Sequence, residues 1–232
     1  MPPKTAHIDH QLWKDSSKAH FHRWAESYDR DIINVLLFEP CYRRVLSQIR
    51  SWQRQGAAPR RMLDVGCGTG SLAVKCLDQT AIGSIVGLDM SENMIRKGAE
   101  KARCLELEDR LSFVIGDSEH LPFRSGAFEL VTCCNSFHHY PHQQRAIEEM
   151  FRVLAPGGRL ILIDGCRDLP IGWFIFDVCV TRWENHVHHC SAGRFRDLLA
   201  TAGFADIRQQ VFGICPPALF NLAVAQPPSA GL

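Results

Sequence analysis

The chain has 232 residues, which is enough for one α/β domain with a sizeable core and too few for two large domains. Its 26 Lys and Arg residues are balanced by 25 Asp and Glu residues, and the net charge of +1 gives no general attraction to nucleic acid or to an anionic membrane. No apolar stretch is long enough to span a membrane, and the first residues lack the apolar core of a secretory signal. We therefore expect a cytoplasmic protein without a nucleic-acid partner.

The ten cysteines are more typical of a hydrophobic core than of a metal site. Several of them, including Cys67, Cys133 and Cys166, lie within or beside apolar runs, where cysteine usually acts as a small buried side chain. No two cysteines have the C-x-x-C spacing of a structural zinc site. We expect free thiols and no bound metal.

Residues 1–58 are predicted to form a helical segment that caps the main domain. Apolar residues recur at helical spacing over residues 10–55, and no strand is evident before Arg61. Pro40 lies within this pattern and predicts two helices with a break between them.

Residues 59–226 are predicted to form the main α/β domain. In its first part, short apolar runs alternate with helical patterns, which favours a parallel sheet because parallel neighbours need long connections. The five runs that we interpret as strands are residues 61–64, 84–89, 111–117, 128–135 and 159–164.

Two further strands, near residues 205–213 and 219–226, are predicted to pair as a hairpin at the edge of the sheet. The expected fold is therefore a Rossmann-like, doubly wound sheet of seven strands, mostly parallel with an antiparallel last strand. Residues 227–232 follow two prolines and are predicted to be a disordered tail.

The regular alternation stops after Asp164, and residues 165–190 are interpreted as an inserted lid. Its aromatic residues suggest an apolar or aromatic molecule beneath it, although such residues often only pack an insertion onto its domain. They are Trp173, Phe174, Phe176 and Trp183. The composition of the cluster formed by His186, His188, His189 and Cys190 would suit a metal, but its position directly before the helix predicted at residues 191–203 favours a structural role.

Three glycines follow the first predicted strand at alternate positions, Gly66, Gly68 and Gly70. They predict a tight turn that presents free N–H groups of a helix N-terminus to a ligand. Their G-x-G-x-G spacing differs from the G-x-G-x-x-G of dinucleotide sites, and the turn lacks the Lys of a P-loop. Because Asp64 lies beside a turn without basic residues, we expect a ligand with an ammonium group and a sulfonium centre rather than a pyrophosphate.

Acids also end the second and third predicted strands. Asp89 follows Gly70 by 19 residues, where Rossmann-type domains hold the ribose hydroxyls of an adenosine. Asp117 could accept a hydrogen bond from the adenine amino group, with the Ser118 backbone at the ring edge and Met90 against the base. Any one such acid is common as a turn former, but their joint placement favours an adenosine site.

These residues carry a resemblance to a known family. From about Trp24 to Gln226 the chain resembles the class I S-adenosylmethionine-dependent methyltransferases, and its segment 24–29 is similar to the N-terminal helix of the ubiquinone and menaquinone C-methyltransferases. The matching motifs are residues 63–70, 86–91, 116–123, 136–139 and 154–158.

The resemblance implies S-adenosyl-L-methionine as cofactor and assigns roles around it. The glycine backbone would face the methionine part, Asp64 and the Asn135 carbonyl would hold its amino group, and Tyr28 would close over it. The cofactor-binding residues expected are Tyr28, Asp64, Gly66, Cys67, Gly68, Gly70, Asp89, Met90, Asp117, Ser118 and Asn135.

The expected activity is in-line transfer of a methyl group to a small-molecule acceptor, whose identity stays open. Such a transfer needs alignment of the two reactants, and a base if the acceptor carries a proton. His138 or His139 could be that base, and we choose His139, although the pair could also simply shape the pocket. The alternatives are an RNA or protein methyltransferase and a non-catalytic protein that binds S-adenosylmethionine.

Overall fold

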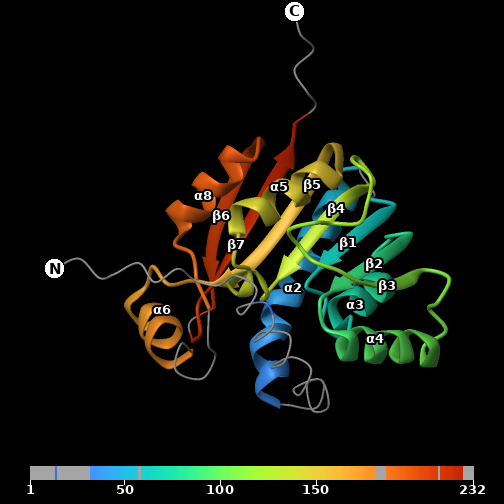
Figure 1. The fold of residues 1–232 in the computed structure, drawn as a ribbon, viewed down its shortest axis with the longest axis horizontal. Coiled ribbons are helices and arrows are strands. Elements are labelled where there is room, and N and C mark those ends of the chain that lie inside the picture. The colour runs from blue at the N-terminus through green and yellow to red at the C-terminus, as the bar shows by residue number, and fades with distance from the viewer. Residues whose placement is uncertain (1–13, 15–31, 57–58, 181–186, 214, 227–232) are drawn as a thin grey trace, which may run out of the picture.

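The computed structural model describes Lys14 and residues 32–56, 59–180, 187–213 and 215–226, with only the backbone of residues 32–37. In this part of the chain, seven strands form one sheet in the order β3-β2-β1-β4-β5-β7-β6 (Figure 1). The strands are β1 (Arg61–Val65), β2 (Ser84–Asp89), β3 (Leu111–Ile115), β4 (Phe128–Cys134), β5 (Leu154–Gly165), β6 (Phe204–Phe212) and β7 (Ala218–Ala225).

The predicted fold class is confirmed. Strands β1 to β5 pair in parallel, and β7 pairs antiparallel with both β5 and β6. The helices around the sheet are α2 (Ile32–Arg54), α3 (Ser71–Gln79), α4 (Glu92–Cys104), η1 (Phe137–His139), α5 (Gln143–Val153), α6 (Pro170–Trp173), η2 (Phe174–Val180) and α8 (Ala192–Thr201).

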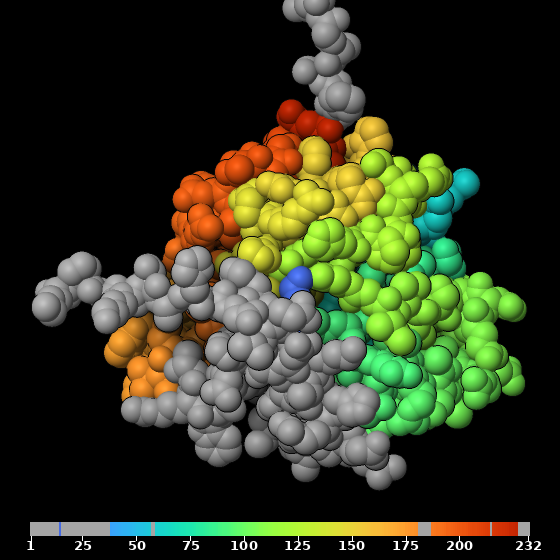
Figure 2. Space-filling model, in the orientation of Figure 1, coloured from blue at the N-terminus to red at the C-terminus, as the bar shows by residue number. Residues whose placement is uncertain are grey.

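Side chains of the central strands alternate between two cores on opposite faces of the sheet. Leu63 and Leu162 belong to the core beneath α5 and α8, whereas Met62 and Ile161 belong to the core beneath α2 and α3. Helices α5 and α8 contact each other and form one continuous surface in Figure 2. Burial on both faces explains why these strands are continuous apolar runs in the sequence.

Helix α2 continues through Pro40, so the predicted break at this residue is wrong. A proline inside a helix lacks one N–H and crowds the carbonyl four residues earlier, which costs about 3 kcal/mol. Beyond Pro40 the helix buries an apolar face against α3 and the sheet, and this packing outweighs the local cost. The buried residues are Cys41, Val45, Leu46, Ile49 and Trp52.

The ring of Phe113 from β3 fills a hollow that three glycines leave open. A Cβ atom added at Gly70 or at Gly98 would lie 2.6 Å from a ring carbon, and one added at Gly87 would lie 2.9 Å from it. The glycines come from the turn after β1, from β2 and from α4. Phe113 therefore fixes the distance between β2, α4 and the glycine turn.

After β5, α6 and η2 occupy the region predicted as a lid. Trp173 and Phe174 are 52% and 54% exposed, whereas the ring of Phe176 lies against Gly165 at the end of β5. The predicted lid residues Trp183 and His186 lie outside the described residues, as do most of the predicted N-terminal cap and the tail at 227–232. The boundaries 1–58, 165–190 and 59–226 therefore stay predictions.

None of the helices in the described ranges has both the length and the apolar character needed to cross a membrane.

Candidate functional site

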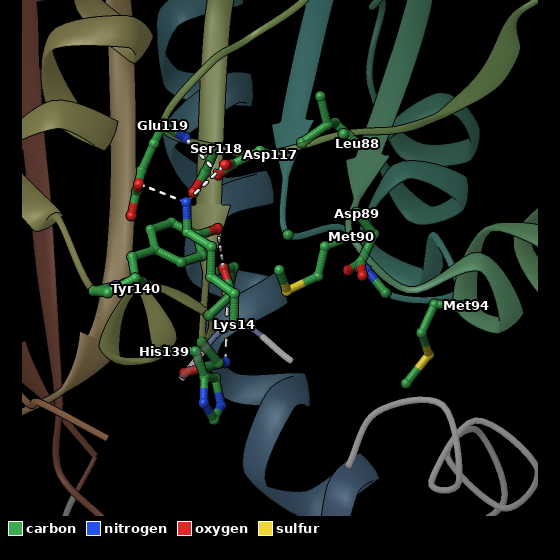
Figure 3. A pocket seen from close by; sticks show the side chains of 17 residues that line it. Lys14, Leu88, Asp89, Met90, Met94, Asp117, Ser118, Glu119, His139 and Tyr140 are labelled. Carbon is green, nitrogen blue, oxygen red and sulfur yellow. Dashed lines mark hydrogen bonds and ion pairs between the residues drawn. The ribbon is translucent and has the colours of Figure 1, made fainter. Parts of the chain in front are cut away.

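The order of the sheet reverses between β1 and β4, because β1 leads to β2 and β3 on one side and β4 leads to β5 on the other. Ligands of open α/β sheets bind beyond the carboxyl ends of the strands at this point. A pocket lies there and encloses about 710 Å³, including the space open to solvent. Its walls come from the glycine turn, the ends of β2 and β4, the segment after β3, η1 and Lys14 (Figure 3).

The structure brings most of the predicted site residues together around this pocket. Those that line it are Gly66, Gly68, Asp89, Met90, Asp117, Ser118, Asn135 and His139. Asp64, Cys67 and Gly70 do not line it, and Tyr28 lies outside the described residues. Contact of these residues with a cofactor stays a prediction.

Asp89 closes the glycine turn from the end of β2. Its Oδ2 accepts a hydrogen bond from the Gly68 N–H and its Oδ1 accepts one from the Ser91 N–H, both at 2.9 Å. Burial raises the pKa of Asp89, while these backbone donors oppose the rise. The carboxylate is therefore held in a fixed orientation at the pocket wall.

The glycine turn does not offer the free N–H groups that its sequence predicts. The N–H groups of Gly66 and Cys67 both donate to the Leu88 carbonyl, at 2.8 and 3.0 Å, and that of Gly68 donates to Asp89. Gly66 has a φ of 69°, and a Cβ there would meet Ser136. The turn thus contributes close approach of backbone to the pocket rather than hydrogen-bond donors.

Asp64 lies behind the pocket, where it is 2% exposed and accepts a hydrogen bond of 2.6 Å from the Thr132 hydroxyl. Burial raises its pKa to about 7, and the charge of Asp89 contributes to the rise. Asp64 does not line the pocket, so its predicted role at a ligand's amino group would be an electrostatic one, acting from behind the glycine turn. Gly70, also predicted for the site, faces Phe113 instead of the pocket.

Asn135 ends β4 with a φ of 55°, a left-handed conformation that Asn adopts more readily than most residues. Beside it, Tyr140 and Ser136 line the pocket, their hydroxyl groups are 3.0 Å apart, and burial raises the pKa of the Tyr140 phenol. Neither residue was among the predicted site residues. Their positions after β4, next to the predicted histidine pair, were the available signal.

Lys14 is a third pocket residue that was not predicted. Its ammonium group lies 2.7 Å from Asp117 Oδ2 and 2.6 Å from Glu119 Oε2 (Figure 3). Burial alone would lower the pKa of Lys14, but the two carboxylates raise it. Partial burial alone would raise the pKa of Asp117, but Lys14 brings it below its usual value. Lys14 thus neutralises part of the negative charge that Asp117 and Glu119 place at the pocket wall.

The two histidines after β4 differ in their surroundings. His139 lines the pocket, and its ring centroid lies 4.1 Å from that of His138. His138 does not line the pocket, but its Nδ1 lies 2.6 Å from Oδ1 of Asp164 at the end of β5. The predicted cluster around residues 186–190 contributes His189, whose ring stacks on His138 at 4.5 Å.

Part of the chain matches a known protein family. Residues 63–162, which include most of β1, all of β2 to β4 and most of β5, match the family model described as a methyltransferase domain. The chain therefore carries a methyltransferase domain.

Curated relatives of this methyltransferase domain include enzymes named for quinone biosynthesis. The ubiquinone/menaquinone biosynthesis C-methyltransferase of Dinoroseobacter shibae is 32% identical over 166 residues, which cover 69% of this chain and 65% of the relative. The demethylmenaquinone methyltransferase of Deinococcus radiodurans is 37% identical over 121 residues, covering 50% of this chain and 49% of the relative. The matched region thus spans between about half and just under two thirds of these relatives.

Solved structures share the fold of the methyltransferase domain and its flanking elements. A chain of the Haloferax volcanii complex between the Trm112 methyltransferase activator and a methyltransferase has a TM-score of 0.75 at 19% identity, over 89% of this chain and 97% of that one. The magnesium protoporphyrin IX methyltransferase of Synechocystis, solved with bound SAH, has a TM-score of 0.72 at 20% identity, over 91% and 99%. At these identities the likeness concerns the fold alone.

Proposed function

We propose that this chain is an S-adenosylmethionine-dependent methyltransferase that acts on a small molecule. One observation carries the proposal: Asp89, Asp117 and the glycine turn line a single pocket at the strand-order reversal of a methyltransferase domain. Ligand sites of open α/β sheets lie at this reversal.

The residues of the pocket suit S-adenosylmethionine. An ionised carboxylate has about four lone-pair positions, and each oxygen of Asp89 uses one of them for a backbone N–H. The remaining positions could accept hydrogen bonds from the two ribose hydroxyls. Asp117 likewise accepts from Lys14 and from the Glu119 N–H and retains capacity for an adenine amino group. Met90 supplies an apolar surface for the base.

When bound, the cofactor would supply an electrophilic methyl group on a positively charged sulfur. The protein then has to align the acceptor with this group and exclude water, since in-line displacement depends mainly on orientation. Ser136, His139 and Tyr140 belong to the pocket wall after β4. In Figure 3, His139 and Tyr140 lie across the pocket from Asp89 and Met90. This wall is the side on which we place the acceptor.

The acceptor is proposed to be an apolar or aromatic small molecule of quinone type. The names of the curated relatives support this class, since they describe enzymes of ubiquinone or menaquinone biosynthesis. The exposed aromatic side chains of Trp173 and Phe174 support an apolar partner near the lid region. Together with residues 1–58 as a cap, residues 165–190 would enclose the acceptor within the domain at 59–226.

Calorimetric titration with S-adenosylhomocysteine tests the binding half of the proposal, with micromolar affinity expected and no binding at millimolar ligand contradicting it. A second experiment tests the transfer: the protein is incubated with methyl-labelled donor and metabolite extract, and the products are examined by mass spectrometry. Labelled methyl groups in small molecules support the proposal. Binding without any transfer would indicate a non-catalytic protein, and label in RNA or protein fractions with salt-dependent RNA binding would indicate the macromolecular alternatives.

A further inference from the structure

We infer that His138, held by Asp164, is the base of the proposed methyl transfer and that the acceptor loses a proton in the reaction. The inference rests on the proposed function and identifies the chemistry of its acceptor. The bond from sulfur to the methyl carbon breaks with its electron pair going to sulfur, and the acceptor atom forms the new bond to carbon. The acceptor's proton passes to Nε2 of His138 and later to solvent.

Backbone N–H groups hold the carboxylate of Asp164 in one orientation. It ends β5 with 1% of its surface exposed, and its Oδ2 accepts the His138 N–H at 2.8 Å. Its Oδ1 accepts the Gly165 N–H at 2.8 Å and lies 2.6 Å from Nδ1 of His138. Two main-chain donors therefore orient the carboxylate toward the ring.

This arrangement selects one tautomer of His138. A carboxylate at Nδ1 favours a proton on that nitrogen, which leaves the lone pair on Nε2, as in hydrolase triads. Burial alone would raise the pKa of Asp164, but its contact with His138 brings the pKa below the usual value. The carboxylate therefore stays ionised and stabilises the imidazolium that forms when His138 takes a proton.

A second histidine holds the ring plane of His138. The rings of His138 and His189 stack at 4.5 Å with 14° between their planes, and Phe176 packs against His189 at 4.6 Å. Burial lowers the pKa of His189 to about 3, so that His189 is neutral and does not repel an imidazolium at His138. Among the described residues, the ionisable groups around His138 are Asp164, His139, His189, His188, whose N–H donates to the His138 carbonyl, and, through the backbone of His189, Arg167.

The same three side chains could be considered a metal site, because donor atoms of His138, Asp164 and His189 lie within 4.8 Å of one another. Ring nitrogens bind metals through lone pairs in the ring plane. Two rings stacked at 14° direct these lone pairs side by side rather than toward one ion. The Nδ1 of His138 already contacts Asp164, so the geometry favours a proton-accepting pair over a metal site.

His139, the base chosen from the sequence, has a different place in this arrangement. It lines the pocket and touches the ring of His138, whereas the buried carboxylate of Asp164 contacts His138. The side chain of His138 is 12% exposed, and its ring lies against that of His139, which lines the pocket. We therefore assign His139 to the pocket wall, where it positions the acceptor.

The kinetic test compares His138→Gln, Asp164→Asn and His139→Gln, with His188→Gln as an exposed control next to the cluster. The acceptor probes are the metabolite extract and reduced 1,4-naphthoquinone. We expect kcat to fall about 10²–10⁴-fold in the first two variants, to change mainly through KM in His139→Gln, and to stay unchanged in His188→Gln. Affinity for S-adenosylhomocysteine should be retained in all four, which separates this result from failure of the proposed function.

Two further readouts distinguish a base from a structural residue. The rate should rise with pH through one ionisation in the wild type, and this ionisation should shift to lower pH in Asp164→Asn because the imidazolium loses its counter-charge. Added imidazole should restore part of the activity of His138→Gln, which keeps the test decisive if Asp164→Asn does not fold.

Three kinetic outcomes would overturn the inference. The first is a kcat of His138→Gln within a few-fold of the wild type, and the second is a fall in the kcat of His139→Gln as large as that of His138→Gln. The third is zinc or cobalt that binds at His138 and is required for turnover. No transfer by a wild type that binds S-adenosylhomocysteine would overturn it as well.

Discussion

The ammonium group of Lys14 lies 2.7 Å from Asp117, across 103 residues of sequence, and joins the N-terminal region to the pocket wall. It also contacts Glu119, whose side chain is 3% exposed. Asp117 is the residue at which we place the adenine of the proposed cofactor. The electrostatics of that end of the pocket are therefore set partly by a residue from outside the methyltransferase domain at 63–162.

Replacing Lys14 with Met should lower the free energy of unfolding at pH 7 by about 1–3 kcal/mol, since the buried charge of Glu119 loses a partner. Lys75→Met is the control, because both side chains of its pair with Glu39 are 34% exposed, and it should change stability by less than about 0.5 kcal/mol. Urea denaturation measures both. Equal effects of the two substitutions would contradict the importance of the Lys14 contacts.

The effect of Lys14→Met should depend on pH in a defined direction. The pKa of Asp117 is lowered in the folded state, so its contribution is present above its ordinary pKa of 3.8 and is lost as the pH falls through its folded value. The pKa of Lys14 is raised, so its contribution is complete below 10.5. The stability difference between wild type and variant should therefore hold from about pH 5 to 9 and shrink in stronger acid.

Replacing Asp89 with Ala should weaken binding of S-adenosylhomocysteine by about 10 to 100-fold, or roughly 1.5 to 3 kcal/mol, because the ribose loses a charged acceptor. The variant should also melt at a lower temperature, since the N–H groups of Gly68 and Ser91 lose their partner. Asp109→Ala is a control at an exposed position outside the pocket. Calorimetry that shows unchanged affinity in Asp89→Ala would disprove its assignment to the ribose.

Replacing Gly66 with Ala should abolish tight cofactor binding and destabilise the protein more than Gly157→Ala. Both glycines have positive φ, 69° and 76°, so both variants carry the strain of a left-handed alanine. Only at Gly66 would the new Cβ meet other atoms, 2.6 Å from the Ser136 Cβ and 2.7 Å from the Tyr140 hydroxyl. Thermal melts should separate the two by about 1–3 kcal/mol, and equal melting temperatures would argue against this close packing.

Replacing Asp64 with Asn should remove a pH dependence of stability. The pKa of Asp64 is raised to about 7 by burial, so the folded state binds a proton more tightly than the unfolded state between about pH 4 and 7. Stability from this group therefore falls as the pH rises through that window. Asn keeps an acceptor for Thr132 without the charge, so its stability relative to wild type should increase from pH 5 to pH 8. A constant difference across this range would show that Asp64 titrates normally.

The fold was predictable because its signals are local. Each central strand is a continuous apolar run bounded by turn residues, and burial on two faces requires such runs. The helix around Pro40 was not predictable in this way. The low helix propensity of proline predicted a break at Pro40. The helix continues because its face from Cys41 to Trp52 packs against residues that are distant in sequence, which local propensity does not report.

The candidate site was predictable where it follows the carboxyl ends of strands. Asp89, Asp117 and His139 line one pocket because parallel strands end at one edge of the sheet. The contact of His138 with Asp164 depends instead on the pairing of β4 with β5, and Lys14 depends on the path of the N-terminal chain. Neither of these two contacts produces a residue spacing that could be recognised in the sequence. Asp64 lies one residue before the end of β1, close to its predicted place, but it is buried outside the pocket lining and accepts a hydrogen bond from Thr132 of the neighbouring strand β4.

The ring of Phe113 lies against Gly70, Gly87 and Gly98, and this contact restricts which substitutions these positions can accept. A methyl group at any of the three glycines would collide with the ring. At Gly98 a smaller side chain at position 113 would relieve this collision, whereas at Gly87 the new Cβ would also lie 2.8 Å from Cys67 Sγ and at Gly70 it would still carry the strain of a φ of 73°. Shrinking that side chain first would leave a void until a glycine gained a methyl group. The order in which substitutions can accumulate here is therefore restricted, and homologous chains are expected to vary at Phe113 and Gly98 together and to retain Gly70 and Gly87.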